Sequence, residues 1–270
     1  MPKEWQEVYD IHVVPINIQF GEQTYLQYRD LDNEGFYRMV EESAKIPKTS
    51  QPSPHQFIEL YKKLARPGDT ILSIHVTSKL SGTFDSAIAA ARELAHRFQV
   101  IPFDSACGSA GLGFMCRHAR MLERAGKTVH EIVQHLEKAR ERVRIVLTLD
   151  RLDYARMSGR VNALQASLVS LLHIKPLVVL KNGVLEITEK VRSRQVSLRR
   201  VLEIASQGLE KERVHLAAVH ARDVQAGQFL LEEARKTFQN VEDTIITDLS
   251  IAVTANLGPG TAGIVVYPAD

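Results

Sequence analysis

Between residues 70 and 149 the sequence alternates short runs rich in β-branched residues with longer amphipathic stretches, and this alternation constrains the fold more than any other feature. Residues 70–76 (TILSIHV) predict a strand, and residues 82–98 carry apolar side chains at the spacing of one helix face. Residues 99–103 and 144–149 predict two further strands, separated by helical patterns. Repeated strand–helix units of this size favour a parallel sheet with helices on its faces.

The pattern changes after residue 150. An apolar helix is predicted over 163–172, and a strand over 174–180 runs into Asn182-Gly183, a pair that is typical of a tight β-hairpin turn. Later strands are predicted near the C-terminus with helices between them. Hairpins mixed with helices indicate an α+β domain.

These patterns together predict an α/β fold of two domains. Residues 1–150 are expected to form an N-terminal parallel-sheet α/β domain, and residues 151–270 a C-terminal α+β domain with a mixed sheet. The sequence shows no internal repeat and no low-complexity linker, so we expect the domains to be closely docked. A ligand tunnel is expected near their interface, because ligand sites often lie between domains.

The composition excludes several classes of protein. The chain has 270 residues, of which 44% are apolar, and its net charge of +2 is too small to indicate nucleic-acid binding. Its two cysteines, Cys107 and Cys116, form no C-x-x-C pair or zinc set, which favours a reduced, cytoplasmic protein. No apolar run has the length of a membrane span, so any contact with a membrane is expected to be transient and at its surface.

Residues 77–83 (TSKLSGT) form the most informative local feature, because they join a predicted strand to a predicted helix. The hydroxyls of Ser78, Ser81 and Thr83 would converge with the free amides of the helix start. Such a place suits an anion, since helix N-termini have unpaired donors and a partial positive charge. In an isolated Ser-Gly-Thr turn, however, Ser81 more commonly serves only to cap the helix.

Two other hydroxyl-rich loops also precede predicted helices. They are residues 49–54 (TSQPSP), where Ser53 and Pro54 predict a helix start, and Asp104-Ser105. Turn and capping chemistry explains each of them singly. Three such loops at one edge of a sheet favour a binding site, because ligands of open α/β sheets gather at that edge.

Two arginines, Arg160 and Arg192, lie in predicted loops of the C-terminal half. An arginine can bind a carboxylate or phosphate through two parallel hydrogen bonds. For either residue alone, an interdomain salt bridge or a solvated charge is the commoner role. Residues 258–260 (GPG) are expected to form a tight turn before the last strand.

Common catalytic motifs are missing from the sequence. It has no H-E-x-x-H, no G-x-S-x-G, no P-loop and no G-x-G-x-x-G after a strand. A hydrolase that uses Ser81 or Ser105 is a rival hypothesis, and it requires a base within hydrogen-bond reach of the serine. His75 is the nearest histidine in sequence, but its apolar strand favours a core histidine.

Taken in order, the motifs resemble those of the DegV family, which includes the fatty-acid-binding subunits of bacterial fatty-acid kinase. The matches extend over nearly the whole chain, and their order is more specific than any one of them. They are TSQPSP (49–54), SKLSGTFDSA (78–87), FDSA (103–106), SGRV (158–161), LLHIKPL (171–177), KNG (181–183) and GPG (258–260).

The resemblance implies that Thr49 and Ser81 hydrogen-bond the carboxylate of a long-chain fatty acid, whose acyl chain the C-terminal domain covers. It implies a carrier without a metal, a cofactor or catalytic residues of its own, because a separate kinase subunit would use ATP to form an acyl phosphate. Arg160 and Arg192 are expected to lie beside the site and to serve that transfer. The other loop residues expected around the site are Ser50, Ser78, Gly82 and Thr83.

The sequence departs from the family pattern at two places. The family's C-terminal loop usually reads His-x-Gly-Pro-Gly, and here Asn256 takes the place of the histidine. An asparagine carries no proton or positive charge near neutral pH, so a lipid-sensing module without phosphoryl transfer is an alternative function. Family members also open with a strand that ends in Asp-Ser and a loop like L-P-x-E. Met1 to Glu4 resemble the inside of that loop, so we expect an upstream strand in the natural protein or an open slot in the sheet.

Overall fold

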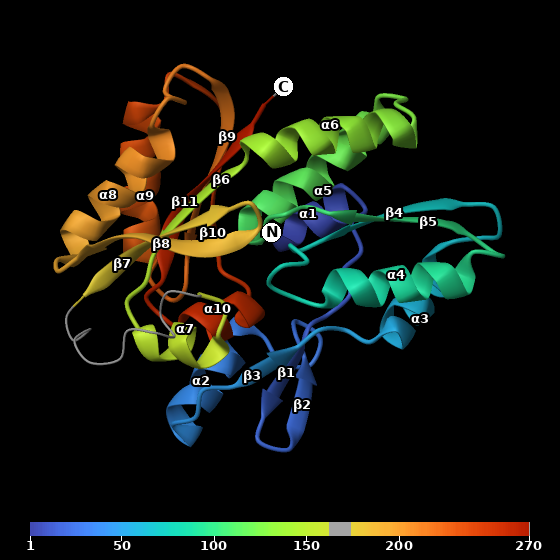
Figure 1. The fold of residues 1–270 in the computed structure, drawn as a ribbon, viewed down its shortest axis with the longest axis horizontal. Coiled ribbons are helices and arrows are strands. Elements are labelled where there is room, and N and C mark those ends of the chain that lie inside the picture. Colours follow the sequence, from blue (N-terminus) through green and yellow to red (C-terminus); the bar gives the residue numbers. More distant parts are fainter. Residues whose placement is uncertain (162–173, 270) are drawn as a thin grey trace. The chain divides into compact units, whose positions relative to one another are not determined.

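The structure, a computed structural model, describes residues 1–161 and 174–269, and the chain forms two compact units (Figure 1). The first unit comprises residues 1–108 and 112–140, and the second comprises 109–111 and 141–270. The strand that begins at residue 144 pairs with strands of the second unit. The predicted helix over 163–172 lies outside the described residues.

The first unit contains two small sheets and the helices that connect their strands. In chain order its elements are α1 (Lys3–Val8), β1 (Asn17–Phe20), β2 (Gln23–Leu26), α2 (Asn33–Ser43), β3 (Lys48–Ser50), α3 (Pro54–Leu64), β4 (Thr70–His75), α4 (Thr83–Leu94), β5 (Gln99–Asp104), α5 (Ser109–Arg124) and α6 (Val129–Arg142).

The strands β4 and β5 form the predicted parallel pair, in register from Thr70 opposite Gln99 to His75 opposite Asp104. Their carboxyl ends therefore lie side by side, each followed by a loop and a helix. This edge is where the sequence places two of its three hydroxyl-rich loops.

The other sheet of this unit is antiparallel, in the order β2-β1-β3, and differs from the sequence prediction. The strand β1 begins at Asn17, two residues after Pro15, which has no N–H to donate to a ladder. Residues 48–50, predicted as loop, form β3 and place Thr49 opposite Ile18. The pairing with β1 is tertiary, and a three-residue strand has no periodicity that the sequence could reveal.

The helix α3 begins where the sequence predicts. Ser53 is its N-cap, Pro54 occupies the first turn, and Gln56 completes a capping box with Ser53. The buried face of α3 packs on α4 around Phe57, Tyr61 and other apolar side chains. This shared core fixes the helices that follow two of the hydroxyl-rich loops. Its buried members are Phe57, Ile58, Tyr61, Ala87, Ala90, Leu94 and Phe98.

The second unit is built on one six-stranded sheet in the order β10-β9-β11-β6-β7-β8. The pair β9–β10 is parallel and the other neighbours are antiparallel, so the predicted mixed sheet is confirmed. Its elements are β6 (Arg144–Thr148), α7 (Leu152–Ser158), β7 (Lys175–Lys181), β8 (Val184–Val191), α8 (Arg194–Ser206), β9 (Arg213–His220), α9 (Val224–Thr237), β10 (Asn240–Asp248), α10 (Ile251–Leu257) and β11 (Ala262–Pro268).

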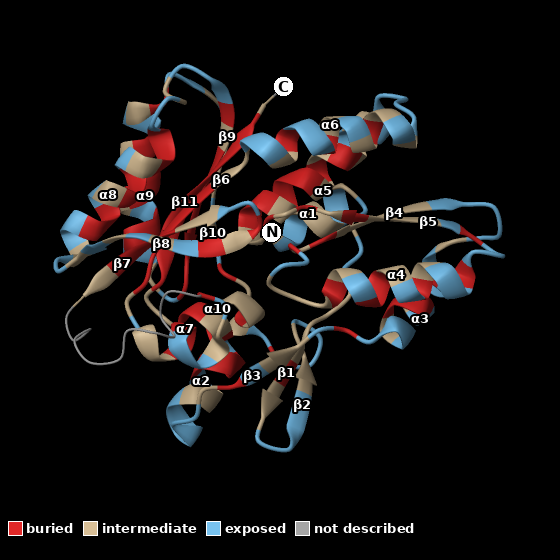
Figure 2. Cartoon of the chain, in the orientation of Figure 1, coloured by how far each residue is buried: buried red, intermediate tan, exposed pale blue. Residues whose placement is uncertain are grey.

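The core of the second unit lies between this sheet and the helices α8 and α9, and Figure 2 shows the buried central strand β11. The predicted hairpin is present, since Asn182 and Gly183 both have positive φ, as the tight turn between β7 and β8 requires. The edge strand β10 was not predicted. Its acidic residues interrupt the apolar alternation by which the sequence reveals the other strands.

Candidate functional site

The loop between β4 and α4 contains the first group of predicted site residues, and its backbone is anchored on the end of β5. The N–H of Ser78 donates to both carboxylate oxygens of Asp104, at 3.2 and 3.3 Å. The N–H of Thr77 donates to the carbonyl of Cys107 at 2.8 Å, and that of Leu80 to the carbonyl of Thr77 at 3.2 Å. The loop is therefore held to the end of β5 and to the loop that follows β5.

The Asp104-Ser105 loop, predicted as a third ligand loop, supports its neighbour. Asp104 also accepts a hydrogen bond from the N–H of Ala106 at 2.9 Å. Ser105 is fully buried, and its hydroxyl donates to the carbonyl of Cys107 and accepts from the N–H of the same residue, both at 3.2 Å. The hydroxyl of Ser105 thus bonds only within its own loop in the described residues, while its N–H donates to the carbonyl of His75 on β4 at 3.1 Å.

Ser81 lies at the start of α4 but is not its N-cap. That position belongs to Gly82, which has no side chain to accept from the first-turn amides. The Oγ of Ser81 shares a hydrogen bond of 2.8 Å with the Oγ1 of Thr83 and accepts from the Thr83 N–H at 3.3 Å. A pair of neutral hydroxyls therefore lies beside the positive end of a 12-residue helix, an arrangement that suits an anion.

The loop that contains Thr49 and Ser50 is fixed by a second set of contacts. Thr49 is half-buried on β3, and Asn17 of β1 donates from its Nδ2 to the carbonyl of Gln51 at 3.0 Å. Gln56 of α3 donates from its Nε2 to the Oδ1 of Asn17 at 3.3 Å. The loop is thus tied to both the strand before it and the helix after it.

The two loops meet through Gln51 and Gly82. A Cβ atom on Gly82 would lie 2.9 Å from the Nε2 and 3.1 Å from the Cδ of Gln51, so the side-chain amide of Gln51 rests directly on the start of α4. The structure therefore brings together the two loops that contain Thr49 and Ser81. Gln51 was not singled out from the sequence, although it stands within the TSQPSP motif.

His75 ends β4 and is an uncharged part of the core beside this site. Its ring packs edge-on against Phe57, at 5.4 Å between centroids, and lies 6.0 Å from Phe84. Burial lowers the pKa of His75 to about 4, although the Asp104 carboxylate acts in the opposite direction. The imidazole is therefore neutral at pH 7, as a core histidine is expected to be.

The geometry gives no support to the rival hydrolase hypothesis. Within the described part of the chain, the hydroxyl of Ser81 bonds to Thr83 and that of Ser105 to Cys107, and no histidine bonds to either serine. Burial raises the pKa of both cysteine thiols, Cys107 and Cys116, to about 12, so neither forms the reactive thiolate at neutral pH.

The remaining predicted residues belong to the second unit. Arg160 is exposed just after α7, where its guanidinium donates to the carbonyl of Ser158, and Arg192 is exposed at the end of β8. Asn256 lies on α10 and donates from its Nδ2 to the carbonyl of Ala252 at 2.6 Å. Among the described ion pairs, neither Arg160 nor Arg192 has a carboxylate partner.

The Gly-Pro-Gly sequence after Asn256 is more than a turn. A Cβ atom on Gly258 would lie 3.0 Å from the Cβ of Arg151, and one on Gly260 would lie 2.6 Å from the Cβ of Asp150. Both glycines also have positive φ. The loop therefore packs closely on the residues that follow β6, and this approach leaves no room for a side chain.

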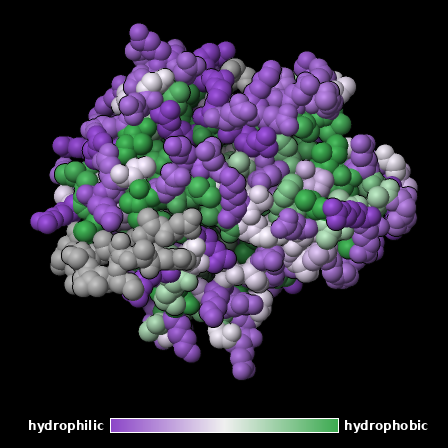
Figure 3. All heavy atoms as spheres, in the orientation of Figure 1, coloured by the Kyte–Doolittle hydropathy of each residue, from purple (hydrophilic) through white to green (hydrophobic). Residues whose placement is uncertain are grey.

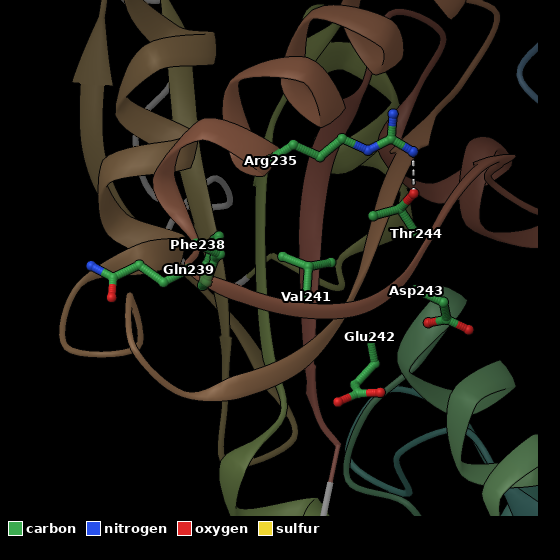
Figure 4. A pocket seen from close by; sticks show the side chains of 7 residues that line it. All are labelled: Arg235, Phe238, Gln239, Val241, Glu242, Asp243 and Thr244. Carbon is green, nitrogen blue, oxygen red and sulfur yellow. Dashed lines mark hydrogen bonds between the residues drawn. The ribbon is translucent and has the colours of Figure 1, made fainter.

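A surface hollow of 350 Å³ lies between α9 and β10, and Figure 4 shows the Arg235 guanidinium donating to the Thr244 hydroxyl at its rim. A second hollow, of 570 Å³, lies at the end of α4 and the start of β5. None of the predicted site residues lines either hollow, so the ligand tunnel stays a prediction. The first hollow is lined by Arg235, Phe238, Gln239, Val241, Glu242, Asp243 and Thr244.

Hydrophilic side chains cover much of the face in Figure 3, with smaller apolar areas between them. None of the helices in residues 1–161 and 174–269 combines the length and apolar character that crossing a membrane requires. In the same residues no cluster of three or more histidine, cysteine or acidic side chains is arranged to hold a metal ion.

Comparison with known proteins relates the whole chain to one family. A family model described as an uncharacterised protein of the DegV family matches residues 1–269. The sequence is 32% identical to Protein DegV of Bacillus subtilis over 269 residues, which are 98% of this chain and 94% of that protein. The crystal structure of DegV, a fatty acid binding protein from Bacillus subtilis, superposes with a TM-score of 0.87 at 30% identity, over 99% of this chain and 95% of that chain. The Streptococcus pneumoniae Fatty Acid Kinase B3 protein, loaded with linoleic acid, shares the fold, with a TM-score of 0.81 at 22% identity over 95% of this chain and 90% of that one.

Proposed function

Because this chain belongs to the DegV family, we propose that it binds a long-chain fatty acid and presents the carboxylate to a partner kinase. In this proposal the hydroxyls of Thr49 and Ser81 hydrogen-bond the carboxylate. The chain acts as a cytoplasmic carrier, and the partner supplies the phosphoryl-transfer chemistry.

The observation that carries the proposal is the contact between the two hydroxyl-rich loops at the start of α4. Gln51 rests on Gly82, so the loop that contains Thr49 contacts the loop that contains Ser81 at the start of α4. That end of a helix attracts a carboxylate through its free amides and its partial positive charge. The fatty-acid-binding description of the Bacillus subtilis relative supports a carboxylate with a long apolar tail as the ligand.

The expected division of binding energy follows from the chemistry of a fatty acid. Burying a methylene gains about 0.8 kcal/mol, so a tail with about 14 of them gains on the order of 11 kcal/mol before ordering costs. Each hydrogen bond to a charged group adds roughly 1.5–3 kcal/mol. The tail therefore sets the affinity, and Thr49 and Ser81 set which end of the molecule is presented.

A carboxylate held by neutral hydroxyls keeps its charge available as a nucleophile. The partner kinase would transfer the γ-phosphoryl group of ATP to a carboxylate oxygen, which yields an acyl phosphate and ADP. We assign Arg160 and Arg192 to this step, because both guanidinium groups are exposed and have no carboxylate partner among the described residues, so they can neutralise the phosphoryl oxygens. The name of the fold neighbour from Streptococcus pneumoniae, Fatty Acid Kinase B3, agrees with such a partner.

Lipid extraction is the direct test of the proposed ligand. Purified protein, denatured and extracted, should release about one fatty acid per chain in mass spectrometry. Addition of a fatty-acid kinase subunit and ATP should then convert the bound lipid into an acyl phosphate. If the protein carries fatty acid but gives no acyl phosphate, the result favours the alternative function, a lipid-sensing module. If the protein neither carries nor takes up fatty acid, the result contradicts the proposal.

Replacing Ser81 with alanine should weaken fatty-acid binding by about 10-fold or more, because one hydrogen bond to a charged group is lost. The dissociation constant for oleate can be measured by displacement of a fluorescent fatty acid. Ser43→Ala serves as the matched control, because it removes an exposed hydroxyl at the end of α2 that bonds to the Met39 carbonyl and the Lys45 N–H. Equal affinities for the Ser81 and Ser43 variants would contradict the assigned role of Ser81.

Replacing Asn256 with histidine should raise the rate of acyl-phosphate formation by about 10-fold or more with the kinase and ATP. A histidine at this position can carry a proton or a positive charge near neutral pH, and general acid–base groups usually contribute at least this much. The affinity for oleate should change little, since Asn256 bonds to its own helix. A transfer rate equal to that of the unmodified protein would show that asparagine is adequate here.

A further inference from the structure

The side-chain amide of Gln51 occupies a position that the roles of Thr49 and Ser81 do not explain. Its Nε2 is the atom of the group nearest to the Cβ position of Gly82, at 2.9 Å, and its Oε1 lies farther away, at 3.6 Å. The donor end of the amide is therefore the end that lies nearer the start of α4. Gln51 itself is exposed, so its amide is open to a ligand.

The backbone of Gln51 is fixed more firmly than an exposed loop residue requires. Its carbonyl accepts the Nδ2 of Asn17 at 3.0 Å, and Asn17 is held in turn by the Nε2 of Gln56 at 3.3 Å. The residue that follows, Pro52, is buried. Within the described residues the side-chain amide of Gln51 makes no hydrogen bond, so its two N–H donors are available to a ligand beside the start of α4.

We propose that Gln51 is a further ligand-binding residue, whose Nε2 amide donates a hydrogen bond to the carboxylate of the bound fatty acid. This inference rests on the proposed function, and it adds a third loop donor to the hydroxyls of Thr49 and Ser81. A primary amide suits the task because it donates to an anion without neutralising it. Gly82 is required beside it because the amide rests where a side chain would stand.

The recognition that follows is specific for an ionised head group. A carboxylate accepts strongly from the amide, whereas an alcohol with the same tail forms a weaker, neutral hydrogen bond. Gln51 therefore contributes to the preference for a fatty acid over a fatty alcohol. Its contribution to the binding of the tail is small, because its amide lies at the head-group end of the site.

The contact with Gly82 makes the proposal testable by a double-mutant cycle in the full-length protein. Gly82→Ala adds a methyl whose three nearest non-adjacent atoms all belong to the flexible end of Gln51, and the φ of −73° suits any residue, so this variant should fold while the amide is displaced. Gln51→Ala removes the amide itself. Each change should weaken oleate binding by about 10-fold, and the two together should weaken it no further than Gln51→Ala alone.

Oleyl alcohol, which has the same tail, is the matched probe for all four proteins of the cycle. Its affinity should change less than twofold with either substitution. Any one of three results would overturn the role of Gln51. The first is an equal loss of affinity for oleate and for oleyl alcohol, and the second is an unchanged affinity for oleate in Gln51→Ala. The third is a weaker affinity for oleate in the double variant than in Gln51→Ala alone. In those cases the unmodified protein still binds oleate, whereas failure of the unmodified protein to bind oleate overturns the proposed function and this inference with it.

Discussion

Replacing Gly263 with alanine should destabilise the second unit by about 3 kcal/mol or more. Gly263 lies in the central strand β11, opposite Leu147 on one side and Val219 on the other. An added Cβ would lie 2.2 Å from the carbonyl oxygen of Val146 and 2.9 Å from the Cα of Leu147. These are main-chain atoms and cannot rotate away, so the cost should reach the upper end of the range for overpacked cores.

Urea unfolding of the full chain can measure this effect and assign it to one unit. Circular dichroism follows both units, whereas the single tryptophan, Trp5, packs on Phe114 and Arg117 and reports on the first. In Gly263→Ala the midpoint of the transition seen by circular dichroism should move to a lower urea concentration. The midpoint seen by Trp5 fluorescence should move less. Gly108→Ala is the control, because its added methyl would make an ordinary contact of 3.5 Å with Val76. Equal stability of the two variants would contradict the prediction.

Acidification from pH 6.5 to pH 4 should cost the first unit on the order of 3 kcal/mol through His75 alone. Burial holds the pKa of His75 at about 4 in the folded chain, below its ordinary value of 6.5. Between these pH values His75 binds a proton in the unfolded chain but not in the folded chain. Its contribution to the free energy of unfolding is therefore fully present above pH 6.5 and is lost as the pH decreases toward 4. One pKa unit corresponds to about 1.4 kcal/mol, which gives the stated magnitude.

The substitution His75→Leu isolates this contribution. Leucine fills a similar volume beside Phe57 and Phe84 and removes a buried Nε2 that has no hydrogen-bond partner among the described residues. Urea unfolding followed by Trp5 fluorescence at pH 7, 5 and 4 should show a weaker loss of stability for the variant. Parallel pH curves for the variant and the unmodified protein would mean that His75 does not titrate as its burial requires.

The sequence predicted those parts of the fold that depend on local patterns. The parallel strands β4 and β5, the capping of α3 by Ser53 and the hairpin at Asn182-Gly183 all follow from periodicity or from the conformational preferences of single residues. The strands β2, β3 and β10 were missed, because they are short or polar and their pairing partners are distant in sequence. The position of β6 in the second unit likewise depends on its tertiary partners.

The candidate site was predicted in part. The hydroxyls of Ser81 and Thr83 lie beside the start of α4, as the Ser-Gly-Thr pattern indicates. The sequence could not show that Asp104 accepts the Ser78 N–H or that Gln51 rests on Gly82, because both contacts join loops that only the folded chain brings together. The role of the glycines in Gly-Pro-Gly was underestimated for the same reason.

The anchoring of the two loops has a consequence for the thermodynamics of ligand capture. One loop is fastened to β1 and α3 through Asn17, Gln56 and the capping box, and the other to β5 through Asp104. Segments that neighbouring elements already hold in place lose little motional freedom when a ligand binds to them. Binding of a head group at the proposed site should therefore carry a small entropic penalty. Discrimination between head groups should arise from the fixed geometry of the loops and not from a conformational change on binding.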